Sequence, residues 1–151
     1  ALSLEEIMIN GKEIRQKAGD RAFLRAIHYF EENRRVDEAA EVLRNGDFDS
    51  FLKLISESGN SSWKYLQNCA VEAEEQPVAA ALAATELYLS RIKSGVCRVH
   101  GGGFAGVIMV VLPGVHTEDY IKYIENQVYG GCVYPVNIRE EGVITVQSNM
   151  H

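Results

Sequence analysis

Apolar residues recur at helical spacing through residues 1–93, and from residue 96 they follow patterns typical of strands. Ser3, Glu5 and Glu6 have the composition of a helix start, so a short helix is expected after them. A second helix is expected to begin near Asp20 and to end at Asn45-Gly46, because glycine readily adopts the left-handed conformation of a helix C-cap. The chain therefore opens with helices.

The helix expected from Asp20 carries two apolar faces. The first set is Phe23, Ala26, Ile27 and Phe30, and the second is Val36, Ala39, Ala40 and Leu43. At about 100° per residue, the second set lies about half a turn away from the first. Either the helix breaks near Asn33, or its two halves bury opposite sides against different neighbours.

Two shorter helices are expected before the strands. Asp47 is suited to cap the first, whose apolar residues are Phe48, Phe51, Leu52 and Ile55. A turn is expected at residues 59–62, with the sequence Gly-Asn-Ser-Ser. Pro77 suits the first turn of the next helix, which is expected to reach Lys93.

The last third of the chain predicts four strands and one helix. The strands are expected at 96–99, 107–112, 133–138 and 143–146, the helix at 117–128, and a turn at 140–142. Strands that follow a run of helices indicate an α+β fold, a small antiparallel sheet with helices on one face. We expect one domain over residues 1–151, helical in 3–93 and sheet-containing in 96–146.

Composition and charge exclude several classes of function. The formal charge is −6 and the pI about 5.2, and no Lys/Arg cluster is strong enough to hold a phosphate backbone, so nucleic-acid binding is excluded. No apolar run is long enough to cross a bilayer, and residues 1–10 lack the pattern of a signal peptide. Cys69, Cys97 and Cys132 are interpreted as small buried hydrophobes in a reducing cytosol. These features predict a soluble, cytoplasmic protein.

The most informative segment is the glycine-rich loop at residues 100–106, His-Gly-Gly-Gly-Phe-Ala-Gly, between two expected strands. Glycines let the backbone approach a ligand closely and direct several N–H groups at a phosphate. The letters satisfy G-x-G-x-x-G, but the dinucleotide-binding form opens a helix and this loop precedes a strand. The protein-kinase motifs V-A-I-K, H-R-D and D-F-G are absent, as is a Walker motif. A tight hairpin whose glycines serve only backbone geometry is the alternative.

Three segments in order resemble the C-terminal domain of galactokinases, in the GHMP kinase superfamily. Residues 32–36, Glu-Asn-Arg-Arg-Val, match an E-N-x-R-V signature, and residues 45–48 and 54–58 match the short helix after it, which usually ends in M-x-E-S-H. Residues 99–106 match the third family motif, usually T-G-G-G-F-G-G. The resemblance covers about residues 20–146.

The resemblance implies a ferredoxin-like antiparallel sheet covered by helices. It also implies transfer of the ATP γ-phosphate to a sugar, with the 1-hydroxyl of galactose as the first candidate acceptor. It places the loop in the cleft between two domains, facing ATP phosphates and sugar. The residues concerned are Gly101, Gly102, Gly103, Phe104, Ala105 and Gly106. Catalytic residues and metal ligands are expected in an N-terminal domain absent from this sequence, which would also supply Mg²⁺. This part alone is expected to be inactive and to self-associate.

Several departures from the family pattern keep alternatives open. His100 stands where a hydroxyl residue is usual, and Ala105 replaces a glycine, so a positive φ there would cost about 1 kcal/mol or more. The segment after Cys69 lacks the usual C-P-E-L-D run. The alternatives are a kinase for another sugar or small alcohol, and a stand-alone ligand-binding or regulatory module.

The remaining polar residues offer weaker candidates. His100 is a second-tier candidate for a bond to a phosphate or sugar oxygen, although a lone histidine at a strand end is more often structural. The histidines are too widely spaced to predict a metal site. The acidic side chains of the helices are expected to be solvated: Glu31, Glu32, Glu72, Glu74 and Glu75.

Overall fold

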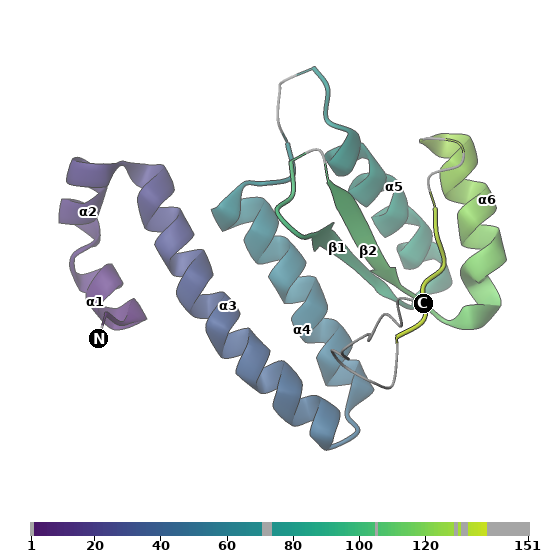
Figure 1. Ribbon diagram of the computed structural model, residues 1–151, viewed down its shortest axis with the longest axis horizontal. Helices are drawn as coiled ribbons and strands as arrows, with labels where there is room; N and C mark the ends of the chain where they lie inside the picture. The colour runs from purple at the N-terminus through teal and green to yellow at the C-terminus, as the bar shows by residue number, and fades with distance from the viewer. Residues whose placement is uncertain (1, 71–73, 105, 129, 131–132, 139–151) are drawn as a thin grey trace, which may run out of the picture.

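The computed structural model describes residues 2–70, 74–104, 106–128, 130 and 133–138, and it has the α+β layout predicted (Figure 1). Helices occupy the first part of the chain, and a two-stranded antiparallel sheet follows. The elements are α1 (Leu4–Ile9), α2 (Gly11–Ala18), α3 (Asp20–Arg44), α4 (Phe48–Ser61), the π-helical turn η1 (Ser62–Leu66), α5 (Pro77–Ile92), β1 (Val96–His100), β2 (Val107–Val111), the 3-10 turn η2 (Gly114–His116) and α6 (Thr117–Gln127).

The amino-terminal segment forms two short helices where one was expected. Ser3 caps α1 through a capping box, in which Glu6 N donates to Ser3 Oγ at 3.2 Å and Ser3 N donates to the Glu6 carboxylate at 2.8 Å. A second helix, α2, begins directly after Asn10 and ends at Gly19, whose φ is 84°. The sequence signal for α2 was weak because the segment has few apolar residues.

Helix α3 is continuous over 25 residues, so the predicted alternative of a break near Asn33 is wrong. It is flanked by α1 and α2 on one side and by α4 and η1 on the other (Figure 1). The second apolar face is only partly covered among the described residues, since Ala39 and Ala40 are half-buried and Val36 is exposed. The alternative prediction, that the second half of the helix buries its apolar face, is therefore wrong for Val36 and Leu43, which are 65% and 47% exposed.

Helix α4 continues through residues 59–61, where a turn was predicted, and that prediction is wrong. A Cβ built on Gly59 would lie 3.0 Å from the Cβ of Arg98 and 3.2 Å from the carbonyl oxygen of Cys97. Helix α4 therefore packs directly onto β1 at this glycine. This long-range packing outweighs the low helix propensity of the Gly-Asn-Ser sequence.

The core lies between the sheet and α5. Strands β1 and β2 pair with Cys97 opposite Val110 and Val99 opposite Ile108, and these four residues pack against the buried side chains of the core. One cluster of buried residues is Cys69, Val78, Leu82 and Val99, and another, between α5 and α6, is Tyr88, Leu89, Tyr120 and Ile124. Each such apolar side chain contributes about 1.5–3 kcal/mol when fully buried. This core supports the strands that hold the glycine-rich loop.

The predicted strand at residues 133–138 is not a strand. Pro135 cannot donate a backbone hydrogen bond, and Val136 and Ile138 are exposed rather than buried against a helix. The predicted strand at 143–146 and the turn at 140–142 lie outside the described residues. In the part of the chain that the structure describes, no helix combines the length and apolar character needed to span a bilayer.

Candidate phosphate-facing site

The glycine-rich loop joins β1 to β2, as predicted, and two of its glycines are in left-handed conformation. Gly101 and Gly103 have φ values of 67° and 77°, whereas Gly102 between them does not have a positive φ. Glycines in this conformation let the backbone turn its N–H groups toward an anion. Phe104 also has a positive φ, 58°, a conformation uncommon for a bulky side chain. Ala105 lies outside the described residues.

Asn68, which lies shortly after η1, contacts the buried side of this loop. Its side chain is among the most buried of the described residues, with 2% exposed. Asn68 Nδ2 donates to the carbonyl oxygen of Gly102 at 3.2 Å, and Phe104 N donates to the carbonyl oxygen of Asn68 at 2.5 Å. A Cβ on Gly103 would lie 2.5 Å from Asn68 Nδ2. Gly103 is therefore required by internal packing, and no sequence motif pointed to Asn68.

The opposite side of the loop is open. A Cβ on Gly101 or Gly102 would meet no atom within 4 Å, and both residues are exposed. Among the described residues, the N–H groups of Gly101, Gly102 and Gly103 have no backbone acceptor, whereas Gly106 N donates to Gly103 O at 3.0 Å. Within the described part of the loop, these three neighbouring donors could serve an outside acceptor.

His100 is the last residue of β1, opposite Val107, and its side chain is exposed. It directly precedes Gly101, so its backbone leads into the loop. Its contact with phosphate or sugar stays a prediction.

A polar network beneath β1 connects three elements. Ser58 Oγ of α4 donates to the Glu32 carboxylate of α3, and Arg98 Nη1 of β1 donates to Ser58 Oγ. Arg98 Nη1 also lies 3.9 Å from Glu32 Oε2, while Arg98 Nε donates to Val99 O at 2.9 Å. The network ties the strand that carries the glycine-rich loop to α3 and α4.

Arg35 completes the network on α3. Its side chain is 9% exposed, and its Nε donates to Glu32 Oε1 at 2.7 Å. Arg35 Nη2 lies 2.6 Å from the same oxygen without a hydrogen bond of good geometry. Glu32 thus neutralises a buried guanidinium and accepts from a hydroxyl at the same time. Burying these charges is tolerable because each has a partner.

The prediction that Glu31 and Glu32 are solvated is wrong. Their side chains are 25% and 23% exposed, and both contact arginines. Hydrogen bonding from Arg34 lowers the pKa of Glu31, against the opposing effect of burial. Glu74 and Glu75 are exposed as expected, and Glu72 lies outside the described residues. Glu32 and Arg35 are the charged positions of the E-N-x-R-V signature, which was used only to recognise the resemblance and not to predict this network.

His28 borders this network. Its Nδ1 lies 2.9 Å from Ser61 Oγ, a hydroxyl of α4. Burial lowers the pKa of His28 from its ordinary value of 6.5; Glu32 raises it, and Arg35 and Arg98 lower it further. The imidazole is therefore neutral in the folded protein at neutral pH.

The lowered pKa of His28 predicts a pH-dependent stability. As pH falls below about 6.5, the unfolded chain takes up a proton at His28 more readily than the folded chain, so this contribution to stability declines through the folded-state pKa. We expect the melting temperature to fall less steeply between pH 7 and pH 5 in His28→Gln than in the wild type. Scanning calorimetry at several pH values measures this, and equal slopes would contradict it.

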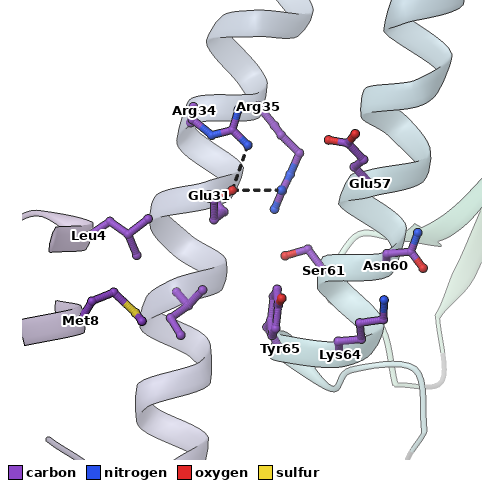
Figure 2. A pocket seen from close by; sticks show the side chains of 11 residues that line it. Leu4, Met8, Glu31, Arg34, Arg35, Glu57, Asn60, Ser61, Lys64 and Tyr65 are labelled. Atoms are coloured by element: carbon purple, nitrogen blue, oxygen red, sulfur yellow. Dashed lines mark hydrogen bonds and ion pairs between the residues drawn. The ribbon is translucent and has the colours of Figure 1, made fainter. Parts of the chain in front are cut away.

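A groove of about 640 Å³ runs between α1, α3 and the α4–η1 segment. Figure 2 shows Leu4 and Met8 on one side of α3 and the polar residues Glu57, Asn60 and Lys64 on the other. Arg34 and Arg35 in this groove are both paired with Glu31. No residue of the glycine-rich loop lines the groove. The groove is therefore separate from the predicted phosphate site.

Comparison with known proteins identifies relatives among sugar kinases. No family model matches the chain. A galactokinase from Canis lupus familiaris is 31% identical over 144 residues, 93% of this chain and 34% of that protein. A galactokinase from Homo sapiens is 33% identical over 130 residues, 85% of this chain and 31% of that protein. A galacturonokinase from Arabidopsis thaliana is 32% identical over 103 residues, 68% of this chain and 22% of that protein.

The α+β fold and these relatives define the chain as a sugar-kinase-like part. It is a galactokinase homologue, and the resemblance seen in the sequence is confirmed. The chain spans about a third of the length of the galactokinases that it matches, which fits a C-terminal fragment of such a protein.

Proposed function

We propose that this chain is the C-terminal part of a galactokinase-like phosphotransferase in the GHMP superfamily, which transfers the γ-phosphate of ATP to a sugar. The observation that carries the proposal is the exposed loop with two left-handed glycines, Gly101 and Gly103, in which the N–H groups of residues 101–103 have no backbone acceptor among the described residues. Similarity to galactokinases over most of the chain supports it. Free Cys69 and Cys97 among the described residues fit the proposed cytoplasmic location.

The loop would act by position and charge. Phosphoryl transfer spreads negative charge over the oxygens of the transferred group, and fixed N–H donors stabilise that charge without having to reorganise. Gly101, Gly102 and Gly103 would supply these donors, with Phe104 and Gly106 shaping the loop around them. Within the described residues, no group of three His, Cys, Asp or Glu side chains is placed to hold a metal ion. Mg²⁺ is proposed to be held by the N-terminal domain that the resemblance implies.

The sugar is proposed to be galactose, phosphorylated at its 1-hydroxyl. Galacturonate is the second candidate, because the Arabidopsis thaliana protein similar to this chain is a galacturonokinase. The full-length protein should release ADP from ATP and Mg²⁺ in the presence of one of the two sugars, and ³¹P NMR of the product identifies the phosphorylated position.

The 151 residues alone should not phosphorylate either sugar, because the catalytic base and metal ligands are proposed to lie elsewhere. The assay compares sugar-dependent ADP release by this chain with that of a heat-killed sample. ADP release well above that of the heat-killed sample would contradict the proposal that the catalytic base and metal ligands lie in another domain. Absence of sugar-dependent release from the full-length protein would contradict the proposed function itself.

A further inference from the structure

We propose that Asn68 is a positioning residue that turns the glycine-rich loop toward the phosphate, an inference that rests on the proposed function. Asn68 does not lie in the loop or in any motif of the resemblance. It follows the π-helical turn η1 and a residue in left-handed conformation, Gln67, with φ 57°. Its side chain nevertheless reaches the loop across 34 positions of sequence.

The geometry of the peptide planes carries the argument. In a trans peptide the C=O and the following N–H point in opposite directions. Asn68 Nδ2 binds the carbonyl oxygen of Gly102, so that oxygen points inward and the N–H of Gly103 points away from Asn68. Asn68 thus determines the direction of one donor of the proposed anion site.

The next peptide plane is held in the reverse sense. Phe104 N donates to the carbonyl oxygen of Asn68, so the carbonyl oxygen of Gly103 points away from Asn68, where it accepts from Gly106 N at 3.0 Å. Two consecutive planes are therefore held by one residue, through its side chain and its backbone. This anchoring also keeps Phe104 at a positive φ, a conformation that is unfavourable without such a contact.

Burial makes the side-chain contact specific. Asn68 is 2% exposed, so a substitute that cannot donate leaves the Gly102 carbonyl facing a buried site without its donor. The change Asn68→Asp keeps the shape and places a carboxylate oxygen against that carbonyl. The peptide between Gly102 and Gly103 is then expected to rotate, which removes the Gly103 N–H from the site.

The test uses the full-length protein with Asn68→Asp and Asn68→Ala, and Asn126→Asp as the matched control. Asn126 lies exposed on α6 and undergoes the same change of charge. Steady-state kinetics for ATP and sugar are measured well below each melting temperature, with the folded fraction determined by circular dichroism. Both Asn68 variants should lose about tenfold or more in kcat/KM for ATP per folded molecule, as expected for loss of an oriented donor, and Asn126→Asp should match the wild type.

A purely structural role would lower activity only in proportion to the folded fraction, with KM for ATP unchanged, and that result would overturn the proposal. Hydrogen exchange of the hydrogen-bonded amides of Phe104 and Gly106, measured by mass spectrometry, is a readout that does not depend on catalysis. Exchange should be faster in both Asn68 variants than in Asn126→Asp, and unchanged exchange would also overturn the proposal. If the wild type phosphorylates no sugar, the proposed function fails, while the exchange result still decides whether Asn68 holds the loop.

Discussion

Gly103→Val is expected to destabilise the protein by about 2–5 kcal/mol, the sum of a positive φ in a residue with a side chain and of overpacking. The backbone of Gly103 has a φ of 77°, and an added Cβ would overlap Asn68. Valine at this position would break both contacts between Asn68 and the loop. Activity should be lost together with stability. Urea unfolding and kinetic assays of the full-length protein measure the two losses.

Gly102→Ala is the matched control for this substitution. A methyl group at Gly102 would meet no atom within 4 Å, and the residue does not have a positive φ, so the melting temperature should stay close to that of the wild type. The methyl group would nevertheless stand on the open side of the loop, where phosphate is proposed to bind, and should lower kcat/KM. Full activity in Gly102→Ala would remove the loop from the site. A stable Gly103→Val variant would show that the loop does not need Asn68 as its support.

Glu32→Ala is expected to destabilise the protein by up to about 3–5 kcal/mol, the cost of breaking a buried ion pair, because Arg35 then keeps only the longer contact of 3.5 Å with Glu31. The substitution removes the carboxylate that neutralises Arg35 and accepts from Ser58, and it leaves Arg98 with one partner fewer. The loss should appear as a lower midpoint of urea unfolding.

Glu38→Ala provides the comparison on the same helix. Glu38 pairs with Arg34, and both side chains are well exposed, at 41% and 49%. Exposed pairs contribute about 0–1 kcal/mol, so this variant should unfold close to the wild type. Equal effects of the two substitutions would show that the Glu32 network does not stabilise the fold.

Local signals in the sequence predicted the elements that depend on local chemistry. Ser3 and Asp47 cap the helices expected to follow them, and Pro77 begins α5. The β-branched runs predicted β1 and β2, and the glycines between them predicted an exposed loop. In each case, the residues that determine the structure lie within a few positions of the element.

Features that depend on contacts between residues distant in sequence were not predicted. Gly59 was read as part of a turn because its contact with Arg98 is invisible in the local sequence. Glu32 was read as solvated because its partner Ser58 lies 26 positions away. Asn68 carries no motif, and only the fold brings it to the loop. The glycine-rich loop between the two strands was therefore predicted from the sequence, whereas the buried contacts that support it were not.

The separation of Asn68 from the glycine-rich loop has a consequence for the order of folding. All of α5 lies between the two partners, so the contact that supports the loop closes a segment of 34 positions. Contacts between distant residues form only after the entropy of closing the intervening chain has been overcome. During synthesis, the loop is thus among the later features to become ordered, although its own sequence is short and local.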